Sequence, residues 1–151
     1  MKRFTVVASA VLAFVIAAVG ALIAQSPTSI AVVRDPGCGC CMKWVAHLRK
    51  AGYQATVTES SNMAAVKDSK GVPASARSCH TGVIGGYVIE GHVPAEDIKR
   101  LLKERPNVVG LAVAGMPSGS PGMEVPSGTI APYDVLAFDK TGKTSVFASH
   151  R

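Results

Sequence analysis

Three cysteines stand within four consecutive residues of this 151-residue chain, at Cys38, Cys40 and Cys41 in the stretch CGCC. Cys38 and Cys41 have the spacing of a C-x-x-C pair, and the residues that follow are predicted to form a helix. The free N–H groups and the dipole at a helix N-terminus favour negative charge and lower the pKa of a thiol. Thiolates at neutral pH exchange disulfides and bind soft metal ions, so these two kinds of chemistry are the candidates.

The position of Cys40 favours metal binding over disulfide exchange. A redox pair needs two sulfurs, and a third would compete in the exchange, whereas in a metal site it is an added ligand. Sulfur ligands select Cu(I), Zn(II) or iron–sulfur clusters. Structural disulfides are a third alternative, because four cysteines outside the cytoplasm usually form two bridges. The spacing opposes it, since the neighbours Cys40 and Cys41 can hardly bridge each other and at most one clustered thiol can pair with Cys79.

The fourth cysteine lies in SCHTGVIGGYVIEGH (residues 78–92), which is predicted to be a β-hairpin with its turn at Gly85-Gly86. This register places Cys79 opposite His92, with the two β-carbons about 5 Å apart on one face of the sheet. His80 then points to the other face, although a bulge at either glycine would exchange the two histidines. Both are candidate ligands, and this geometry favours His92.

Met116 and Met123 lie seven residues apart in a loop rich in glycine and proline. Thioethers are soft ligands for Cu(I), so the loop could form a lid that adds one to the site. The alternative, which we favour slightly, is that both side chains fill gaps in the packing. His47 is predicted to lie on the surface, His150 near a frayed terminus, and Trp44 in the core.

Alternating and helical patterns of apolar residues predict the elements that position these side chains. In chain order they are a strand at 29–33, a helix from 41 that Gly52 ends, a strand at 53–59, a helix at 62–70, the hairpin, and a helix over VPAEDIKRLLKERP (residues 93–106). The order β-α-β-α-β-β-α predicts an α/β protein with a thioredoxin-like fold. In that fold the chemistry lies where the first helix begins, and the start of the third strand faces it, which would return Cys79 to the cluster.

The remaining residues are predicted to extend a single domain at residues 29–151, with a C-terminal extension from about 107. Residues 110–132 read as a long loop rich in glycine and proline, which is usually functional or disordered. Residues 134–147 read as a small hairpin around Lys140-Thr141-Gly142.

The N-terminus predicts export from the cytoplasm. A basic start, Met1-Lys2-Arg3, precedes an uncharged and mostly apolar stretch that ends near Ala24. Residues 1–24 therefore read as a signal peptide, and the protein as periplasmic. An uncleaved anchor is the alternative, because about 20 apolar residues can span a bilayer. Only in that case do we expect contact with a membrane.

The net charge excludes little except nucleic-acid binding. The chain has 16 basic and 10 acidic side chains, and without Lys2 and Arg3 the balance is 14 against 10, or +4. The basic residues are scattered and do not gather with aromatic ones, which disfavours nucleic acid as a partner.

Three separated motifs resemble a known family. The stretches DPGCGCCMKW, GVPASARSCHTGVIGGYVIEGHVPAEDIKRLL and GLAVAGMPSGSPGME occur in this order. Together they resemble the CopG-type copper-resistance proteins of the bacterial periplasm, a family also known as an uncharacterised metal-binding domain. The resemblance covers roughly residues 30–124. It implies a thioredoxin-like fold, export, and copper binding by the cysteines of CGCC and SCH, which are Cys38, Cys40, Cys41 and Cys79. It implies a weaker role for His80 and somewhat strengthens the case for Met116 and Met123.

The sequence therefore predicts a periplasmic protein that binds copper as Cu(I) through a cysteine cluster, in copper resistance or handling. Three or four thiolates from two elements could bridge several ions. Its expected partners are metal ions and other periplasmic copper-handling proteins. The alternative is an enzyme, a thiol–disulfide or copper oxidoreductase that uses Cys38 and Cys41. A disulfide-stabilised domain without active thiols is the third alternative.

Overall fold

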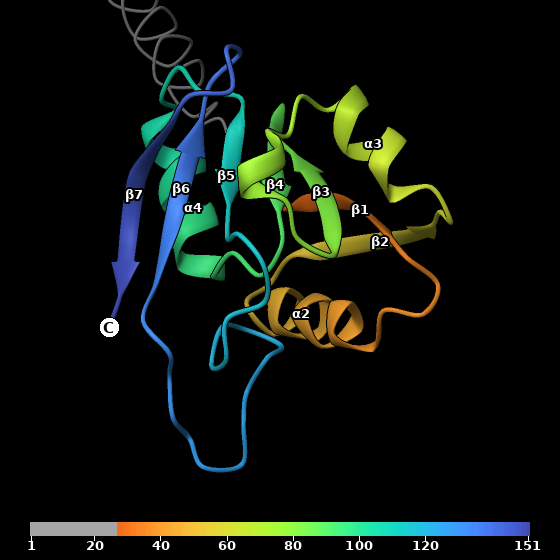
Figure 1. Ribbon diagram of the computed structural model, residues 1–151, viewed down its shortest axis with the longest axis vertical. Helices are drawn as coiled ribbons and strands as arrows, with labels where there is room; N and C mark the ends of the chain where they lie inside the picture. Colours follow the sequence, from red (N-terminus) through yellow and green to blue (C-terminus); the bar gives the residue numbers. More distant parts are fainter. Residues whose placement is uncertain (1–26) are drawn as a thin grey trace, which may run out of the picture.

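The structure of the protein is a computed structural model that describes residues 27–151. A seven-stranded sheet with the order β2-β1-β3-β4-β5-β6-β7 forms its centre (Figure 1). The predicted signal peptide or anchor at residues 1–24 lies outside the described residues. Within residues 27–151, no helix has the length and apolar character needed to cross a membrane.

The first seven helices and strands follow the predicted order. They are β1 (Ser29–Arg34), α2 (Gly39–Lys50), β2 (Gln54–Glu59), α3 (Met63–Ser69), β3 (His80–Ile84), β4 (Tyr87–Glu90) and α4 (Ala95–Glu104), with a short 3-10 helix η1 (Ala74–Ala76) before β3. The α/β class is thus confirmed. β1 and β2 are parallel, and β3 and β4 pair antiparallel with Ile84 opposite Tyr87. Gly85 and Gly86 have φ values of 58° and 87°, which the predicted two-residue turn requires. The description thioredoxin-like stays a prediction.

Helices cover both faces of the sheet (Figure 1). Trp44 and Leu48 of α2 and Ile98 and Leu101 of α4 are fully buried in the larger core cluster, which also contains Ile89 of β4. The smaller cluster lies on the opposite face of the sheet. It contains Val88, the neighbour of Ile89 in β4, and successive side chains of a strand point to opposite faces. It also contains residues next to α3 and in η1. Its members are Val72, Ala76, Val88, Ala112 and Phe138. The start of α2 thus lies on the same face as α4.

The prediction for the C-terminal residues was partly wrong. Residues 110–112, which we expected in a loop, form β5 (Gly110–Ala112), which pairs parallel with β4 and antiparallel with β6 (Tyr133–Phe138). β6 and β7 (Thr144–His150) form the predicted hairpin, with its turn between Asp139 and Lys143, and they extend the main sheet. A three-residue strand that begins with glycine carries little periodic signal. Gly110 is required there because a β-carbon at this position would overlap the Val88 carbonyl.

The predicted locations of two histidines were also wrong. His150 belongs to β7, where its Nε2 lies 2.8 Å from Asp97 Oδ2 and its ring stacks on Tyr133 with centroids 4.9 Å apart. His47 is half-buried, and its Nε2 accepts a 3.1 Å hydrogen bond from the Ala95 N–H at the start of α4. The hydrogen bond from Ala95 to His47 satisfies one of the free N–H groups at the start of α4.

Candidate metal centre

The loop between β1 and α2 is shaped by two of its polar side chains. Arg34 Nη1 donates to the carbonyls of Asp35, Pro36 and Cys38 at 3.0, 3.0 and 3.2 Å. The Asp35 carboxylate accepts from the Gly37 N–H at 2.8 Å, and its carbonyl accepts from the Cys38 N–H at 3.0 Å. Helix α2 then begins with no side-chain cap and no acidic residue in its first turn. The sequence-based expectation that the free N–H groups of this helix start favour negative charge on the cysteines stays a prediction.

Cys38 and Cys41 are joined by a disulfide, whereas Cys40 and Cys79 are free thiols. The sequence analysis proposed all four as metal ligands, so Cys38 and Cys41 can take that role only after reduction. The pairing within C-x-x-C is what an oxidoreductase would use. The chain's four cysteines form one disulfide, rather than the two that a disulfide-stabilised domain would have.

The fold returns Cys79 to the other three cysteines. Its Sγ lies 3.9 Å from Cys40 Sγ and 3.5 Å from Cys41 Sγ, and Cys40 Sγ lies 3.5 Å from Cys38 Sγ. All four sulfurs are within 4.8 Å of one another. Two thiolates bound to one ion at about 2.3 Å lie roughly 3.8–4.0 Å apart, so after reduction these sulfurs would need only small shifts to share ions.

Both candidate histidines face Cys79. Its Sγ is 3.2 Å from His92 Nε2 and 3.3 Å from His80 Nδ1, and the two ring centroids are 5.0 Å apart. The expectation that His80 points to the other face was therefore wrong. The ladder of β3 and β4 ends at Thr81 opposite Glu90, so Cys79 and His92 lie beyond it and strict alternation does not apply to them.

The two histidine rings differ in their surroundings. His80 is fully buried with its ring centroid 4.3 Å from that of Trp44, and its Nε2 has no hydrogen-bond partner. Trp44 itself is in the core, as predicted, and its Nε1 donates to the Val93 carbonyl at 2.9 Å. His92 Nδ1 lies 2.8 Å from the Pro121 carbonyl, which can only accept. His92 therefore carries its proton on Nδ1 and presents an unprotonated Nε2 to Cys79, the arrangement common for histidines that bind metals.

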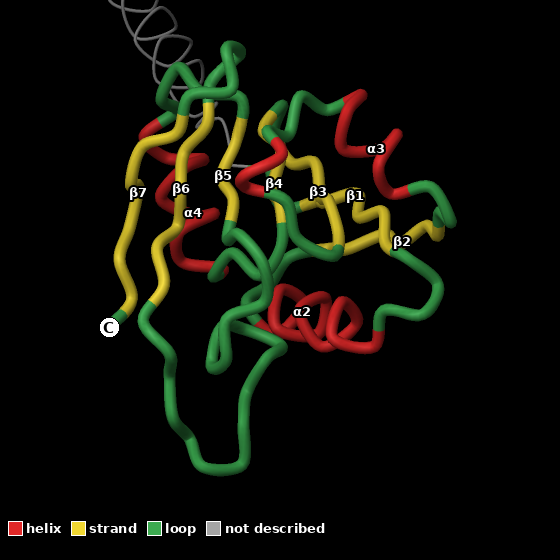
Figure 2. Tube along the Cα trace, viewed as in Figure 1, coloured by secondary structure: helices red, strands yellow, loops and turns green. Residues whose placement is uncertain are grey.

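The loop between β5 and β6 passes beside α2 (Figure 2). It brings Met116 to the cysteine cluster. A β-carbon on Gly122 would lie 2.7 Å from the backbone nitrogen of Trp44 and 3.1 Å from the carbonyl oxygen of Cys40. The loop backbone therefore touches the first turns of α2. Met116 Sδ lies 3.9 Å from Cys40 Sγ. Within residues 27–151, the Met123 thioether makes no such contact, and Met123 contributes backbone hydrogen bonds to Gly119 and Ser120.

Burial keeps Cys79 and the two cluster histidines uncharged. Burial, and next the nearby Cys40, raise the pKa of the Cys79 thiol to about 11. Burial lowers the pKa of His80 to about 3, with further lowering by His92 and Lys67, and burial also lowers the pKa of His92. Cys79 is thus a neutral thiol beside neutral imidazoles. Binding of a metal ion there would release the thiol proton.

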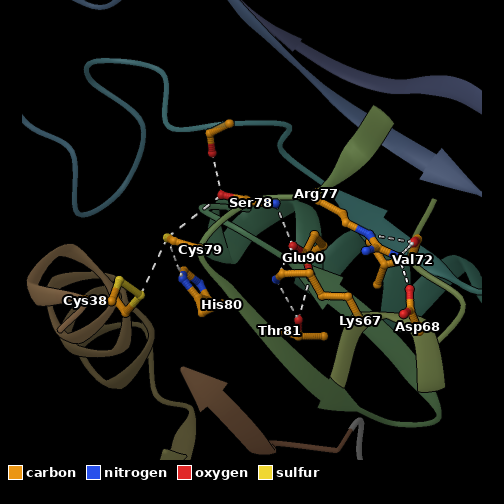
Figure 3. A network of polar contacts seen from close by, with 12 residues as sticks. Cys38, Lys67, Asp68, Val72, Arg77, Ser78, Cys79, His80, Thr81 and Glu90 are labelled. Atoms are coloured by element: carbon orange, nitrogen blue, oxygen red, sulfur yellow. Dashed lines mark hydrogen bonds and ion pairs between the residues drawn. A yellow bond between two sulfur atoms is a disulfide. The ribbon is translucent and has the colours of Figure 1, made fainter. Parts of the chain in front are cut away.

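A buried polar network behind Cys79 was missed by the sequence analysis (Figure 3). Glu90 is fully buried and accepts hydrogen bonds from Lys67 Nζ at 2.6 Å, Thr81 Oγ1 at 2.7 Å and the Ser78 N–H at 2.6 Å. Ser78 precedes Cys79, so Glu90 fixes the backbone that carries the cysteine. A single charge in the apolar strand YVIE was the available signal, because a buried charge needs a partner.

Comparison with known proteins places the chain in a family. A family model described as "Protein of unknown function, DUF411" matches residues 76–123. A solved structure of copper resistance protein CopG, form 1, is 48% identical, covers 82% of this chain and 98% of its own, and superposes with a TM-score of 0.77. The chain belongs to the CopG family of copper resistance proteins. A form 2 structure of CopG is 46% identical, covers 84% of this chain and 100% of its own, and has a TM-score of 0.78. No curated protein matches.

Membership of the CopG family confirms the resemblance drawn from the three motifs. The family-model match begins at Ala76 and ends at Met123. It therefore contains Cys79, both cluster histidines and Met116. The CGCC stretch lies outside that match. In this CopG-family protein the cysteine cluster thus joins a matched segment to the start of α2.

Proposed function

We propose that this protein binds Cu(I) in the periplasm, in copper resistance or handling. The reduced sulfurs of Cys38, Cys40, Cys41 and Cys79 are the main ligands, and His92, His80 and Met116 supply further donors. The observation that carries the proposal is the convergence of four sulfurs, from two remote chain segments, within 4.8 Å of one another. Soft sulfur ligands prefer Cu(I), and the similar solved proteins are named for copper resistance.

The number of sulfurs supports a site with more than one ion. Cys40 and Cys79 each lie between two other sulfurs, at 3.5 and 3.9 Å, which suits thiolates that bridge two ions. Met116 is exposed, and its thioether lies on the Cys40 side of the cluster. It would act as a donor at the rim, where ions arrive from solvent or from another periplasmic copper-handling protein.

The test is an anaerobic titration of the full chain, expressed in a bacterium, purified and fully reduced. Cu(I) is supplied as a complex with a competing chelator, and bound copper is counted per chain. We expect one or more tightly bound equivalents, with large losses in Cys38→Ser and Cys79→Ser. His92→Gln should weaken binding, whereas His150→Gln, a matched change outside the cluster, should not. Absence of copper binding by the reduced wild-type protein would overturn the proposal.

Fractionation of the same cells tests the proposed location. The protein should leave the cells with periplasmic marker proteins on osmotic shock. If the N-terminal segment remains as an anchor, the protein should instead sediment with the membranes. Retention with cytoplasmic markers would contradict the periplasmic assignment.

The Cys38–Cys41 disulfide supports a second candidate, a thiol–disulfide or copper oxidoreductase. Cys41 Sγ is 3.5 Å from Cys79 Sγ, within reach of an exchange reaction. An insulin-reduction assay with dithiothreitol distinguishes the candidates. Catalysed reduction that Cys38→Ser abolishes, without copper binding, would favour the enzyme. Copper binding without insulin reduction would favour the binding protein.

A further inference from the structure

The chain enters the fold beside the end of α4 and the turn between β3 and β4. Pro27 is the first residue that the structure describes. A β-carbon on Gly85 would lie 2.7 Å from Pro27 Cγ and 2.8 Å from Cδ2 of Leu102, which belongs to the last turn of α4. The Thr28 carbonyl accepts a 2.8 Å hydrogen bond from the Gln54 N–H at the start of β2. The entry point is thus fixed by contacts with three elements.

A hollow of about 210 Å³ lies at this entry point. It is lined by Pro27, by residues 51–53 after α2, and by Lys99 and Leu102 of α4, with no acidic residue among them. A neighbouring hollow shares Lys99 and also contains Glu96. The surface beside Pro27 is therefore positive, and Glu96 marks its limit.

Three unpaired lysines gather around this hollow. Lys99 and Lys103 are exposed and stand four residues apart on one stripe of α4, and Lys50 is the exposed last residue of α2. In the described part of the chain, none of the three forms an ion pair. The next stripe of α4 differs, because Arg100 there pairs with Glu104 at 3.8 Å. The three ammonium groups are therefore free to bind an anionic partner.

The sequence shows which anionic partner is within reach. The apolar stretch ends near Ala24, so only Gln25 and Ser26 separate it from Pro27. Three extended residues span roughly 10 Å. While the apolar stretch lies in a bilayer, as an anchor or before its cleavage as a signal peptide, Pro27 is held within that distance of the bilayer surface. The potential of an anionic bilayer extends about 8 Å at physiological salt, which is a comparable distance.

We propose that the face formed by Pro27, Lys50, Lys99 and Lys103 docks the domain onto an anionic phospholipid bilayer. The ammonium groups contact lipid phosphates, and the apolar stems of the lysines lie against the headgroup layer. The CGCC stretch lies at the opposite end of α2, which has 12 residues and a length of about 18 Å, so the docking face is separate from the candidate metal centre. The inference rests on the proposed export and goes beyond copper binding.

Lysine acetylation in the presence of vesicles tests this proposal. The protein is purified in the form that the expressing bacterium produces. It is mixed with vesicles of phosphatidylcholine with or without phosphatidylglycerol, or reconstituted into them if it retains the apolar stretch. Mass spectrometry then measures acetylation by an N-hydroxysuccinimide ester at each lysine. With the anionic vesicles we expect at least fivefold slower acetylation at the three lysines of the face. Lys43, at the start of α2, and Lys70, after α3, are exposed and should not change. About 1 M NaCl, which shortens the screening length to about 3 Å, should abolish the protection.

Removal of charge identifies the lysines that act. Each lysine near an anionic surface strengthens binding about fivefold, so Lys99→Gln/Lys103→Gln should weaken docking about 25-fold. The result would be renewed acetylation of Lys50. The double variant Lys43→Gln/Lys70→Gln loses the same charge elsewhere and should leave Lys50 protected.

Three outcomes would overturn the inference. One is equal acetylation of the three lysines with anionic and neutral vesicles, and another is an equal effect of the two double variants. The third is protection by soluble polyglutamate but not by vesicles, which would assign the face to an acidic protein. Copper titration of Lys99→Gln/Lys103→Gln should match that of the wild-type protein, so each of these outcomes leaves the proposed copper binding intact.

Discussion

Cys79 is the residue on which the whole site depends. It contacts a sulfur of each part of the CGCC stretch, the free Cys40 and the disulfide-bonded Cys41, as well as both histidine rings. Cys79→Ser would therefore remove the ligand that joins the two segments of the proposed copper site. Burial lowers the pKa values of both histidines beside Cys79 and so keeps their rings neutral.

Burial of neutral His80 predicts a loss of stability in acid. The pKa of His80 is about 3 in the folded protein, against 6.5 when it is unperturbed. The unfolded state therefore binds the proton more readily, so the contribution of His80 to stability should be constant above pH 6.5 and fall as pH drops from 6.5 toward 3. One proton corresponds to at most about 1.4 kcal/mol per pH unit. Urea unfolding of the metal-free oxidised protein at pH 7, 6, 5 and 4, followed by Trp44 fluorescence, measures this slope.

The variant His80→Gln should reduce that slope by about one proton. A residual slope is expected because burial also lowers the pKa values of His92 and His47. His150→Gln, a matched change at a histidine of β7, should leave the His80 contribution in place. An unchanged slope in His80→Gln would contradict the assignment of His80 as a buried neutral histidine.

The buried pair of Lys67 and Glu90 predicts a second effect on stability. Glu90→Gln would leave the Lys67 ammonium buried without a counter-charge, which should cost about 3 kcal/mol in the free energy of unfolding. Lys67→Met together with Glu90→Gln should recover part of that loss, because no unpaired charge remains. Glu59→Gln is the matched control: Glu59 pairs with Arg34, its side chain is 52% exposed, and its loss should cost less than about 1 kcal/mol. Equal losses in the two Gln variants would contradict this account.

At the scale of the elements, the contact of the loop with α2 determines where His92 points. Gly122 has a φ of 88° and touches Trp44 and Cys40, and the preceding Pro121 carbonyl holds His92. Gly122→Ala should displace the loop and release the imidazole. Changes to groups that orient a metal ligand typically cost 10–100-fold in affinity, so we expect Cu(I) binding to weaken about tenfold or more. Chelator competition measures it.

A glycine elsewhere in the same loop provides the control. Gly128 also has a positive φ, 70°, but a β-carbon there would meet nothing within 4 Å. Gly128→Ala should therefore incur only the backbone strain of about 1–2 kcal/mol and leave Cu(I) affinity unchanged. Equal copper affinities in Gly122→Ala and Gly128→Ala would show that the loop contact does not position His92.

The sequence predicted the elements whose pattern is local and missed the contacts that depend on several elements at once. The hairpin register followed from Gly85-Gly86 and the alternating residues beside them. The orientation of His80 did not, because Cys79 lies just before β3 and the pleat does not constrain it. The bond from His92 to Pro121 joins residues 29 positions apart, and no spacing rule predicts it. The oxidation state of Cys38 and Cys41 could not be predicted either, since C-x-x-C fits both a disulfide and two ligands.

At the scale of the whole molecule, the sheet joins the candidate metal centre to the C-terminal hairpin. β5 pairs with β4 on one side and β6 on the other, so β6 and β7 continue the sheet that carries Cys79 and His92. Helix α4 strengthens this connection, because Arg100 lies 3.8 Å from the centroid of the Phe147 ring and Asp97 contacts His150. The C-terminal strands thus cover the same core cluster as α2, since Val135 belongs to it together with Trp44.

This shared core predicts that the hairpin unfolds together with the candidate metal centre. Val135→Ala removes two buried methylene equivalents and should lower the free energy of unfolding by about 1.5–2 kcal/mol. Val146→Ala, in the partner strand but 60% exposed, should change it by less than about 0.5 kcal/mol. Because Trp44 is the only tryptophan, its fluorescence follows α2, while far-UV circular dichroism follows all elements. In Val135→Ala both signals should shift to lower urea by the same amount. A separate early transition in circular dichroism, with the Trp44 midpoint unchanged, would show instead that β6 and β7 unfold independently of the metal centre.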